Sequence, residues 1–270
     1  MSNLDERCRT FHRLHESGCF VIPNPWNVGS ARLLVQLGFK ALATTSSGFA
    51  WSRGLVDGAV PLDDVLAHLR ALSASVPVPI SADFENGFSD DADGVEKHVA
   101  AASTTGIAGL SIEDSSGNPS HPLFDFSNAV ERVRAARQAI NGSGHSLVLT
   151  ARSEGFIRGR PDLGETIRRL VAYGEAGADC LYAPGLRSLA DIKAVVDAVA
   201  PKPVNVLVGT DFATVADLAT AGVRRISVGG ALARAAWTGF LDSAKEIAEH
   251  GTFQGLGRAI SGGDMNKRFT

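Results

Sequence analysis

The chain has 270 residues, of which 44% are hydrophobic and 20% are charged, and its formal net charge is −3. This length suits one large α/β domain, and the charge gives no positive field that would attract nucleic acid or an anionic membrane. No apolar run approaches the roughly 20 residues that cross a bilayer, the opening residues lack the pattern of a signal peptide, and the scattered cysteines are typical of reduced thiols. We therefore expect a cytoplasmic protein.

Short β-rich runs alternate with amphipathic helical runs along the chain. Most β-rich runs are continuously apolar up to their C-terminal end, as in strands buried on both faces of a parallel sheet. The eight runs expected to be strands are, in chain order, residues 19–26, 41–47, 78–85, 108–114, 147–154, 180–184, 204–208 and 225–229. Several of the helical patterns between them end in glycine, a common C-terminal stop. Eight βα units in this length predict a closed (β/α)8 TIM barrel rather than an open doubly wound sheet.

The C-terminal part of the sequence is longer than a barrel requires. No linker or low-complexity segment divides the chain, so residues 1–270 are expected to form a single domain. Residues 241–270 continue with a helical pattern and a glycine-containing tail, and we interpret them as a C-terminal helical extension. Two arrangements fit this extension: it packs on a neighbouring subunit, or it caps its own barrel.

Polar residues gather at the predicted C-terminal ends of the strands, where TIM barrels carry their chemistry. In the stretch PISADFENGF (79–88), Asp83 and Glu85 are two residues apart, so on a strand both carboxylates face the same way. Glu113 ends the next strand and Arg152 the one after it. Carboxylate oxygens without a Cys or His partner suit Mg²⁺ or Mn²⁺, and Arg152 suits a bidentate grip on a substrate carboxylate.

The turn after the second strand can present backbone N–H groups to a developing oxyanion. It contains Ser46, Ser47 and Gly48. Each feature also has a purely structural explanation: an acid can cap the next helix, the arginine can simply neutralise Glu113 or Glu154, and the SSG segment can be only a turn. Their coincidence at one end of the barrel favours a functional site.

The histidines and cysteines give weaker signals. His68 and His98 lie in helical patterns and are expected at the surface, and no partner is visible for His15. His121 lies in SSGNPSHPLFDF, a loop after the fourth strand with the composition of a mobile lid, and is a candidate for contact with substrate. Cys180 begins a strand and is expected in the core.

Four motifs, TTSSGFAWSRGLVDG, SADFENGF, SIEDS and LTARSEGF, resemble the isocitrate lyase/phosphoenolpyruvate mutase superfamily in order and spacing, over roughly residues 20–240. The segment VNVLVGTDFATVADLATAGVRRISVGGALARAA is also similar to the branch that holds members acting on small 2-oxoacids. The resemblance implies a (β/α)8 barrel, a Mg²⁺ ion and chemistry through a metal-bound enolate of an α-oxycarboxylate. It also implies a tetramer in which a last helix is exchanged between subunits.

The resemblance further implies roles for individual residues. The family's substrate-binding turn matches Ser47, Gly48 and Phe49, and its acid after the second strand matches Asp57. Its metal-binding acids match Asp83, Glu85 and Glu113. Its substrate-binding arginine matches Arg152, and its polar residue on the seventh strand matches Asn205. Glu85 stands where the family more often has a second aspartate, so it is expected to reach the metal partly through water.

The loop after Glu113 departs from the family pattern. Isocitrate and methylisocitrate lyases carry a Lys-(Lys/Arg)-Cys-Gly-His motif there, whereas this chain reads DSSGNPSHPLFD, without lysine or cysteine. They also place a glutamate at the end of the sixth strand, where this chain reads YAPG. These departures argue against both activities. Phosphonate-acting members use a lysine in the same loop, and only Asn118 matches part of their set.

The combined prediction is a Mg²⁺-dependent lyase that cleaves a C–C bond of a 2-oxo or 2-hydroxy carboxylate, such as an oxaloacetate-like acid or a substituted malate. The candidate catalytic residues are Arg152, Asp57 and His121, with His121 as the candidate proton donor. Residues 115–125 would close over the site to exclude water.

Three other functions remain open at this point. They are P–C bond chemistry of the phosphonopyruvate hydrolase or mutase type, a non-catalytic 2-oxoacid-binding barrel, and a phosphate-binding isomerase that uses the SVGG loop. The expected partners are a small-molecule 2-oxo or 2-hydroxy carboxylate and further copies of the chain, as a tetramer or dimer, with no nucleic acid and no membrane.

Overall fold

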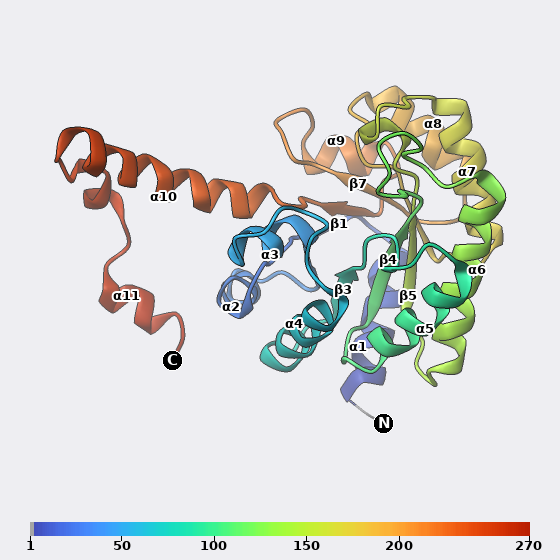
Figure 1. Cartoon of the computed structure of the whole chain (residues 1–270), viewed down its shortest axis with the longest axis horizontal. Coiled ribbons are helices and arrows are strands. Elements are labelled where there is room, and N and C mark those ends of the chain that lie inside the picture. The colour runs from blue at the N-terminus through green and yellow to red at the C-terminus, as the bar shows by residue number, and fades with distance from the viewer. Residues whose placement is uncertain (1–2) are drawn as a thin grey trace.

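The computed structural model describes residues 3–270 and shows a barrel of parallel strands surrounded by helices, with one long helix extending from it (Figure 1). The eight strands are β1 (Phe20–Ile22), β2 (Leu42–Ala43), β3 (Ile80–Asp83), β4 (Gly109–Glu113), β5 (Val148–Arg152), β6 (Cys180–Tyr182), β7 (Val204–Leu207) and β8 (Arg225–Ser227). The helices of the barrel layer are α1 (Asn3–Glu16), α2 (Val28–Gln36), α3 (Ser46–Ser52), α4 (Leu62–Ser75), α5 (Ala92–Ser103), α6 (Phe126–Gly142), α7 (Leu163–Glu175), α8 (Leu189–Val199) and α9 (Val215–Thr220), with the 3-10 turn η1 (Gly155–Ile157). The prediction of a (β/α)8 barrel is confirmed.

The barrel closes between β1 and β2, the two strands at the ends of the sheet order β1-β8-β7-β6-β5-β4-β3-β2. Ala43 N–H donates to the carbonyl of Pro23 at 3.1 Å. The buried side chain of Asn24 donates to the carbonyl of Thr44 at 2.8 Å and accepts from the backbone N–H of Val228 at 2.9 Å. Asn24 therefore closes the barrel by joining the ends of β1, β2 and β8.

The strand β3 is shorter than the sequence predicts, and this changes the position of Glu85. The strand ends at Asp83, Phe84 is fully buried, and Glu85 adopts a positive φ of 48°. Gly87 N–H donates to the carbonyl of Phe84 at 2.9 Å, which makes the chain turn at this point. The prediction that Asp83 and Glu85 share one face of a strand is therefore wrong, because the alternation of side chains stops where the strand stops.

The inside of the barrel is more polar than its outer surface beneath the helices. Along β5 the side chains alternate, so Thr150 and Arg152 face one way while Leu149 and Ala151 face the other. Leu149 and Ala151 are fully buried in the apolar core. Asn205 on β7 and Arg225 on β8 are also buried and bind each other inside the barrel. This polar interior leads up to the strand ends, where the site lies.

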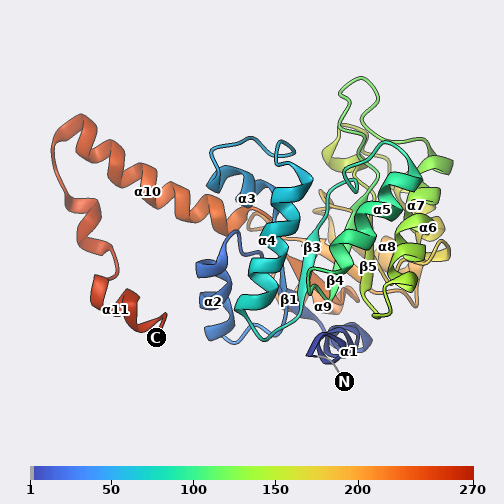
Figure 2. The same ribbon diagram turned by 60° about the horizontal axis from the view of Figure 1, so that its bottom comes forward.

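The C-terminal segment leaves the barrel as the helix α10 (Ala231–His250), followed by η2 (Gln254–Arg258) and α11 (Gly262–Lys267). Both views show α10 projecting away from the barrel and the chain then folding back (Figures 1 and 2). The terminal turn touches α2, where the Gln36 side chain donates to the carbonyl of Arg268. Apolar side chains remain exposed on this arm, with Phe240 at 59% and Phe253 at 62%. The extension predicted for residues 241–270 is thus present, and its helix begins ten residues earlier.

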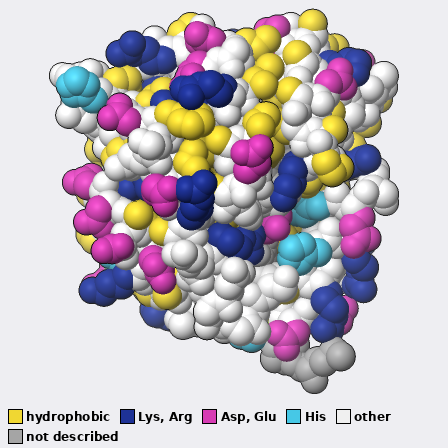
Figure 3. Space-filling model, turned by 90° about the vertical axis from the view of Figure 1, so that its right-hand side faces the viewer, with side chains coloured by type: hydrophobic (Ala, Val, Ile, Leu, Met, Phe, Trp, Pro, Cys, Tyr) yellow, Lys and Arg dark blue, Asp and Glu magenta, His cyan; other side chains and the backbone are white. Residues whose placement is uncertain are grey.

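The outer surface of the helix layer carries acidic and basic side chains side by side on the face seen in Figure 3. Within residues 3–270, no helix combines the length and the apolar composition needed to cross a membrane.

Candidate active site

A cavity of about 360 Å³ opens at the C-terminal ends of the strands. It is lined by residues from both halves of the barrel, among them Ser46 and Ser47, Asp57, Asp83 and Arg152. The sequence predicts chemistry at this end of the barrel, and these five predicted residues share one cavity. Asn205 lines the same cavity from the opposite wall.

Arg152 lies at the centre of a buried group of carboxylates. Its guanidinium contacts Asp83 Oδ1 at 2.6 Å, Glu113 Oε2 at 3.1 Å and Glu154 Oε1 at 2.8 Å. The register of the sheet explains part of this arrangement, because Glu113 on β4 pairs directly with Arg152 on β5. Burial opposes the charge of Arg152, but the neighbouring Glu154, Glu113 and Asp83 raise its pKa well above the usual value. Arg152 therefore neutralises the glutamates, as the structural interpretation expects, and it also lines the cavity; its grip on a substrate carboxylate stays a prediction.

The pKa values of Glu113, Glu85 and Asp57, near Arg152, are raised. Burial, followed by repulsion from Glu154, raises the pKa of Glu113 well above its ordinary value. Burial also raises the pKa of Glu85 to about 7, with further contributions from Asp83 and Asp57. Burial likewise raises the pKa of Asp57, against a hydrogen bond from Ser46 that lowers it. Asp57, Asp83 and Glu85 thus form an acidic group near Arg152, and Glu113 contacts the same guanidinium.

The turn that begins α3 is held in place by backbone hydrogen bonds. Ser46 N–H donates to Asp83 Oδ2 at 3.0 Å, and Asp83 N–H donates to Thr44 Oγ1 at 2.8 Å. Gly48 N–H donates to the capping side chain of Thr45 at 3.3 Å. A Cβ on Gly48 would lie 2.7 Å from the methyl group of Thr45, so only glycine fits. The turn therefore brings Ser47 to the cavity wall beside Asp83.

The glycines of the SVGG loop after β8 serve close packing at the same place. A Cβ on Gly230 would lie 2.7 Å from Ser47 Oγ. The loop passes directly over the Ser47 turn, and this contact explains the requirement for glycine there. Phosphate binding is not needed to account for the loop.

The three acids predicted to bind metal do not form a ready-made cage. Within residues 3–270, no group of three His, Cys, Asp or Glu side chains is arranged to hold a metal ion. Mg²⁺ often keeps several water molecules and binds through only one or two carboxylates. The donor chemistry of Asp83 and Glu113 fits such a hydrated ion. Glu85, on the turn beyond β3, fits a contact through water.

Asn205 is held from both ends of its amide group. Its Oδ1 accepts from Arg225 Nε at 2.9 Å, and its Nδ2 donates to Ser227 Oγ at 2.9 Å. Only 1% of the residue is exposed. The amide is therefore fixed in one orientation at the wall of the cavity.

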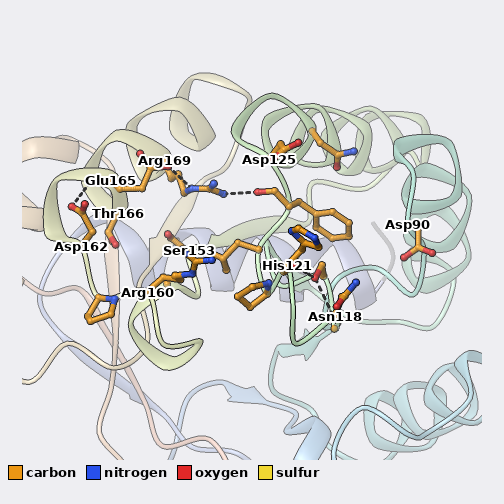
Figure 4. Close-up of a pocket in the computed structure, with 18 residues that line it drawn as sticks. Asp90, Asn118, His121, Asp125, Ser153, Arg160, Asp162, Glu165, Thr166 and Arg169 are labelled. Atoms are coloured by element: carbon orange, nitrogen blue, oxygen red, sulfur yellow. Dashed lines mark hydrogen bonds and ion pairs between the residues drawn. The ribbon is translucent and has the colours of Figure 1, made fainter.

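His121 lies in a different cavity, of about 1050 Å³, between the loop after β4 and the helices α6 and α7 (Figure 4). Arg160 and Asn118 line this outer cavity too, and none of the three lines the barrel-mouth cavity. The loop is anchored where it returns to the barrel: Phe124 N–H donates to the carbonyl of Asp114 at 2.9 Å, and Arg169 Nη1 donates to the carbonyl of Phe124 at 3.1 Å. The structure therefore does not bring His121 together with Arg152.

His68 is the clearest residue that the sequence interpretation misplaced. Its ring stacks on Phe49 with centroids 3.7 Å apart, and its buried Nε2 has no hydrogen-bond partner. The expectation of a surface histidine is wrong, because His68 follows Val65 by three residues on α4 and shares its buried face. That spacing is visible in the sequence. His98 is also partly buried and contacts the carbonyl of Gly87 at 2.9 Å, while Cys180 is buried as predicted.

Comparison with known proteins gives consistent matches. A family model described as phosphoenolpyruvate phosphomutase matches residues 11–248. An uncharacterized protein of Mycobacterium tuberculosis is 36% identical over 222 residues, which cover 82% of this chain and 81% of the relative. The 2-methylisocitrate lyase of Escherichia coli is 32% identical over 182 residues, covering 64% of this chain and 60% of that enzyme.

Two solved structures show the same fold. The crystal structure of a putative lyase/mutase from Burkholderia cenocepacia has a TM-score of 0.96 and 44% identity, over 99% of this chain and 97% of that chain. A phosphonopyruvate hydrolase in complex with oxalate and Mg²⁺ has a TM-score of 0.85 and 24% identity, over 97% of this chain and 94% of that chain. At this identity the second match is a likeness of fold.

Proposed function

The chain belongs to the phosphoenolpyruvate mutase/isocitrate lyase superfamily, and from this premise we propose that it is a Mg²⁺-dependent carbon–carbon lyase. The proposed substrate is a 2-oxo or 2-hydroxy dicarboxylate, an oxaloacetate-like acid or a substituted malate. The superfamily contains lyases of such acids, one of which is the 2-methylisocitrate lyase, as well as enzymes that act on P–C bonds.

The observation that carries the proposal is the position of Arg152. A buried guanidinium that faces a cavity beside a Ser–Gly turn and several carboxylates is suited to bind an α-oxycarboxylate. When bound, Mg²⁺ would supply Lewis-acid stabilisation of the negative charge that develops on the substrate. Asp83 and Glu113 would hold it, together with water.

The residues of the chain would divide the remaining work among them. Arg152 would orient the substrate carboxylate through its charge and through the one N–H of Nη1 that its contacts with Asp83, Glu113 and Glu154 leave free, and the Ser47 turn would stabilise the developing oxyanion. Glu85, whose pKa burial raises to about 7, can hold or release a proton at its carboxyl group near neutral pH. Asp57 would position Ser46 through their hydrogen bond.

Product analysis tests this proposal against the P–C alternative. Purified protein with Mg²⁺ is incubated with oxaloacetate, substituted malates or phosphonopyruvate, and the release of pyruvate or of inorganic phosphate is measured. We expect pyruvate or another 2-oxoacid from a dicarboxylate, and no phosphate. Phosphate release from phosphonopyruvate alone would establish P–C chemistry instead.

Substitution of a proposed metal ligand tests whether the activity arises at the barrel-mouth cavity. We expect Asp83→Ala to lower kcat/KM by about 10²–10³-fold, because it removes a proposed metal ligand and a partner of Arg152. Asp63→Ala on the outer helix α4 is the matched control and should leave activity unchanged. If Asp83→Ala retains full activity, the assignment of the site is wrong. If no substrate reacts but oxalate raises the melting temperature only with Mg²⁺, the protein is a 2-oxoacid-binding barrel.

The proposal extends to assembly through α10. Its exposed apolar side chains, including Trp237, Phe240 and Leu241, lie on a helix that projects from the barrel (Figure 2). A neighbouring copy of the chain could cover them, as exchange of the last helix between subunits would do. Light scattering after size exclusion should show a homo-oligomer, and truncation after residue 230 should shift it to smaller species.

A further inference from the structure

Arg225 carries a buried charge without an acidic partner. It lies on β8, is 5% exposed and lines the barrel-mouth cavity. Its Nε donates to Asn205 Oδ1 at 2.9 Å, its Nη2 donates to Thr150 Oγ1 at 2.9 Å, and its Nη1 lies 3.3 Å from His15 Nε2. Across residues 3–270, none of the ion pairs involves Arg225. Arg152 in the same barrel, by contrast, contacts three carboxylates.

His15 does not supply the missing charge. Its Nδ1 lies 2.7 Å from the carbonyl of Phe11, so this nitrogen carries the hydrogen and Nε2 is the acceptor for Arg225. Burial, and after it the charge of Arg225, lowers the pKa of His15 to about 3. The imidazole is therefore neutral at physiological pH. All the contacts of Arg225 are made with neutral groups.

The guanidinium retains donors for a further ligand. An arginine has five N–H groups, and the contacts with Asn205, Thr150 and His15 use three of them. One N–H on Nη1 and one on Nη2 remain, and two such N–H groups can donate to the two oxygens of a carboxylate. A buried charge without a counter-ion is costly. An anionic ligand would remove that cost.

The barrel-mouth cavity connects Arg225 with the candidate active site. Arg225 lines the same cavity as Ser46, Asp83 and Arg152. Its partner Thr150 precedes Arg152 by two residues on β5, which places it roughly 7 Å deeper along the strand. Arg152 and the exposed Arg234 thus line this cavity as well, and Arg225 adds a buried cation without an acidic partner towards its floor.

We propose that Arg225 forms an inner anion subsite and binds the distal carboxylate of the substrate, the one that does not meet Ser46 and Arg152. This inference rests on the proposed function insofar as it takes the substrate to be a dicarboxylate. It assigns the discrimination between dicarboxylates and monocarboxylates to one residue of β8. The same donors would bind an inorganic anion, so the test separates the two sources.

Calorimetric binding of two matched probes tests the subsite. In the presence of Mg²⁺, malate is compared with 2-hydroxybutyrate, which has the same carbon chain but lacks the distal carboxylate. We expect the wild-type protein to bind malate about 10–100-fold more tightly, as a charge-assisted hydrogen-bonded pair allows. Arg225→Met should abolish this preference while 2-hydroxybutyrate still binds. Arg225→Lys, which keeps the charge without the paired donors, should retain only part of it.

The controls separate recognition from folding. Thr150→Val removes one neutral partner and keeps the charge of Arg225, so the malate preference should persist. If Arg225→Met does not fold, Arg225→Gln, which can still bond Asn205, should show the same loss of preference. An unchanged preference in folded Arg225 variants would overturn the inference.

Two further outcomes distinguish a subsite for the distal carboxylate from a site for an inorganic anion, and from the proposed lyase activity. If sodium chloride alone stabilises the wild-type protein but not Arg225→Met, and the malate preference is independent of Arg225, the occupant is an inorganic anion and the proposal for the distal carboxylate fails. If the preference depends on Arg225 but no dicarboxylate is cleaved, the subsite stands and the proposed lyase activity fails.

Discussion

The two cavities at the top of the barrel differ in size and in organisation. The outer cavity beside α6 and α7 has about 1050 Å³, against about 360 Å³ for the barrel-mouth cavity. The outer one is bordered by a loop and by exposed side chains such as Arg160 and His121. The smaller one is bordered by strand ends whose side chains bind one another while buried, as Arg152 and Glu154 do. Fixed geometry, rather than volume, marks the site where catalysis is expected.

Two matched arginine substitutions, one in each cavity, should therefore differ strongly in their effect on stability and activity. We expect Arg152→Met to lower the free energy of unfolding by about 3–5 kcal/mol, because it leaves buried carboxylates without their cation, and to lower kcat by at least about 10²-fold. Arg160→Met in the outer cavity should change stability by less than about 0.5 kcal/mol and leave kcat unchanged. Urea unfolding and steady-state kinetics measure both. Equal losses in the two variants would remove the distinction between the cavities.

The residues that the sequence located correctly lie at the ends of regular strands. Asp83, Glu113 and Arg152 each terminate an apolar run, and the parallel arrangement of a barrel brings such ends together whatever the details of packing. The family resemblance added Asp57, which follows a turn and shows no such local pattern. Its place at the cavity wall depends on how the loop after α3 folds back.

The residues that the sequence misplaced or did not single out depend on where elements end or on contacts between distant strands. Glu85 follows the last residue of β3, so the alternation used to place it no longer applied. His121 depends on the path of a loop. Arg225 lies at the start of a predicted strand, and its pairing with Thr150, 75 residues earlier, follows only from closure and register. Such contacts require the three-dimensional structure.

A second prediction concerns the acidic group beside Arg152. Because burial raises the pKa of Glu85 from 4.5 to about 7 in the folded protein, the folded state binds this proton more tightly than the unfolded state. The resulting stabilisation is complete below about pH 4.5 and is lost as the pH rises through 7, by up to roughly 3 kcal/mol. Glu85→Gln lacks this titration, so its free energy of unfolding should fall less than that of the wild type between pH 5 and pH 8.

The measurement is chemical unfolding with EDTA present, at several pH values. Glu96→Gln, on the exposed face of α5, is the control and should follow the wild type. Parallel curves for Glu85→Gln and the wild type would show that Glu85 is not held in the buried acidic group. The acidic side chains at the barrel mouth would then be less buried and less fixed in solution than they are in the structure.

The smallest expected effect belongs to the outer cavity. His121 is exposed, its backbone carbonyl accepts from Ser116 within the loop, and its side chain faces the outer cavity (Figure 4). We expect His121→Ala to change stability by less than about 0.5 kcal/mol and kcat by less than about threefold, since no reacting group of the barrel mouth lies beside it. His250→Ala on α10 serves as a control for loss of a surface histidine. A decrease in kcat of about 10²-fold or more, without a change in KM, would mean that the loop after β4 moves His121 to the substrate, where it acts as a proton donor. In that case the loop after β4 would have a closed position in which the two cavities form a single active site. The separation of the two cavities would then belong only to the open position of the loop.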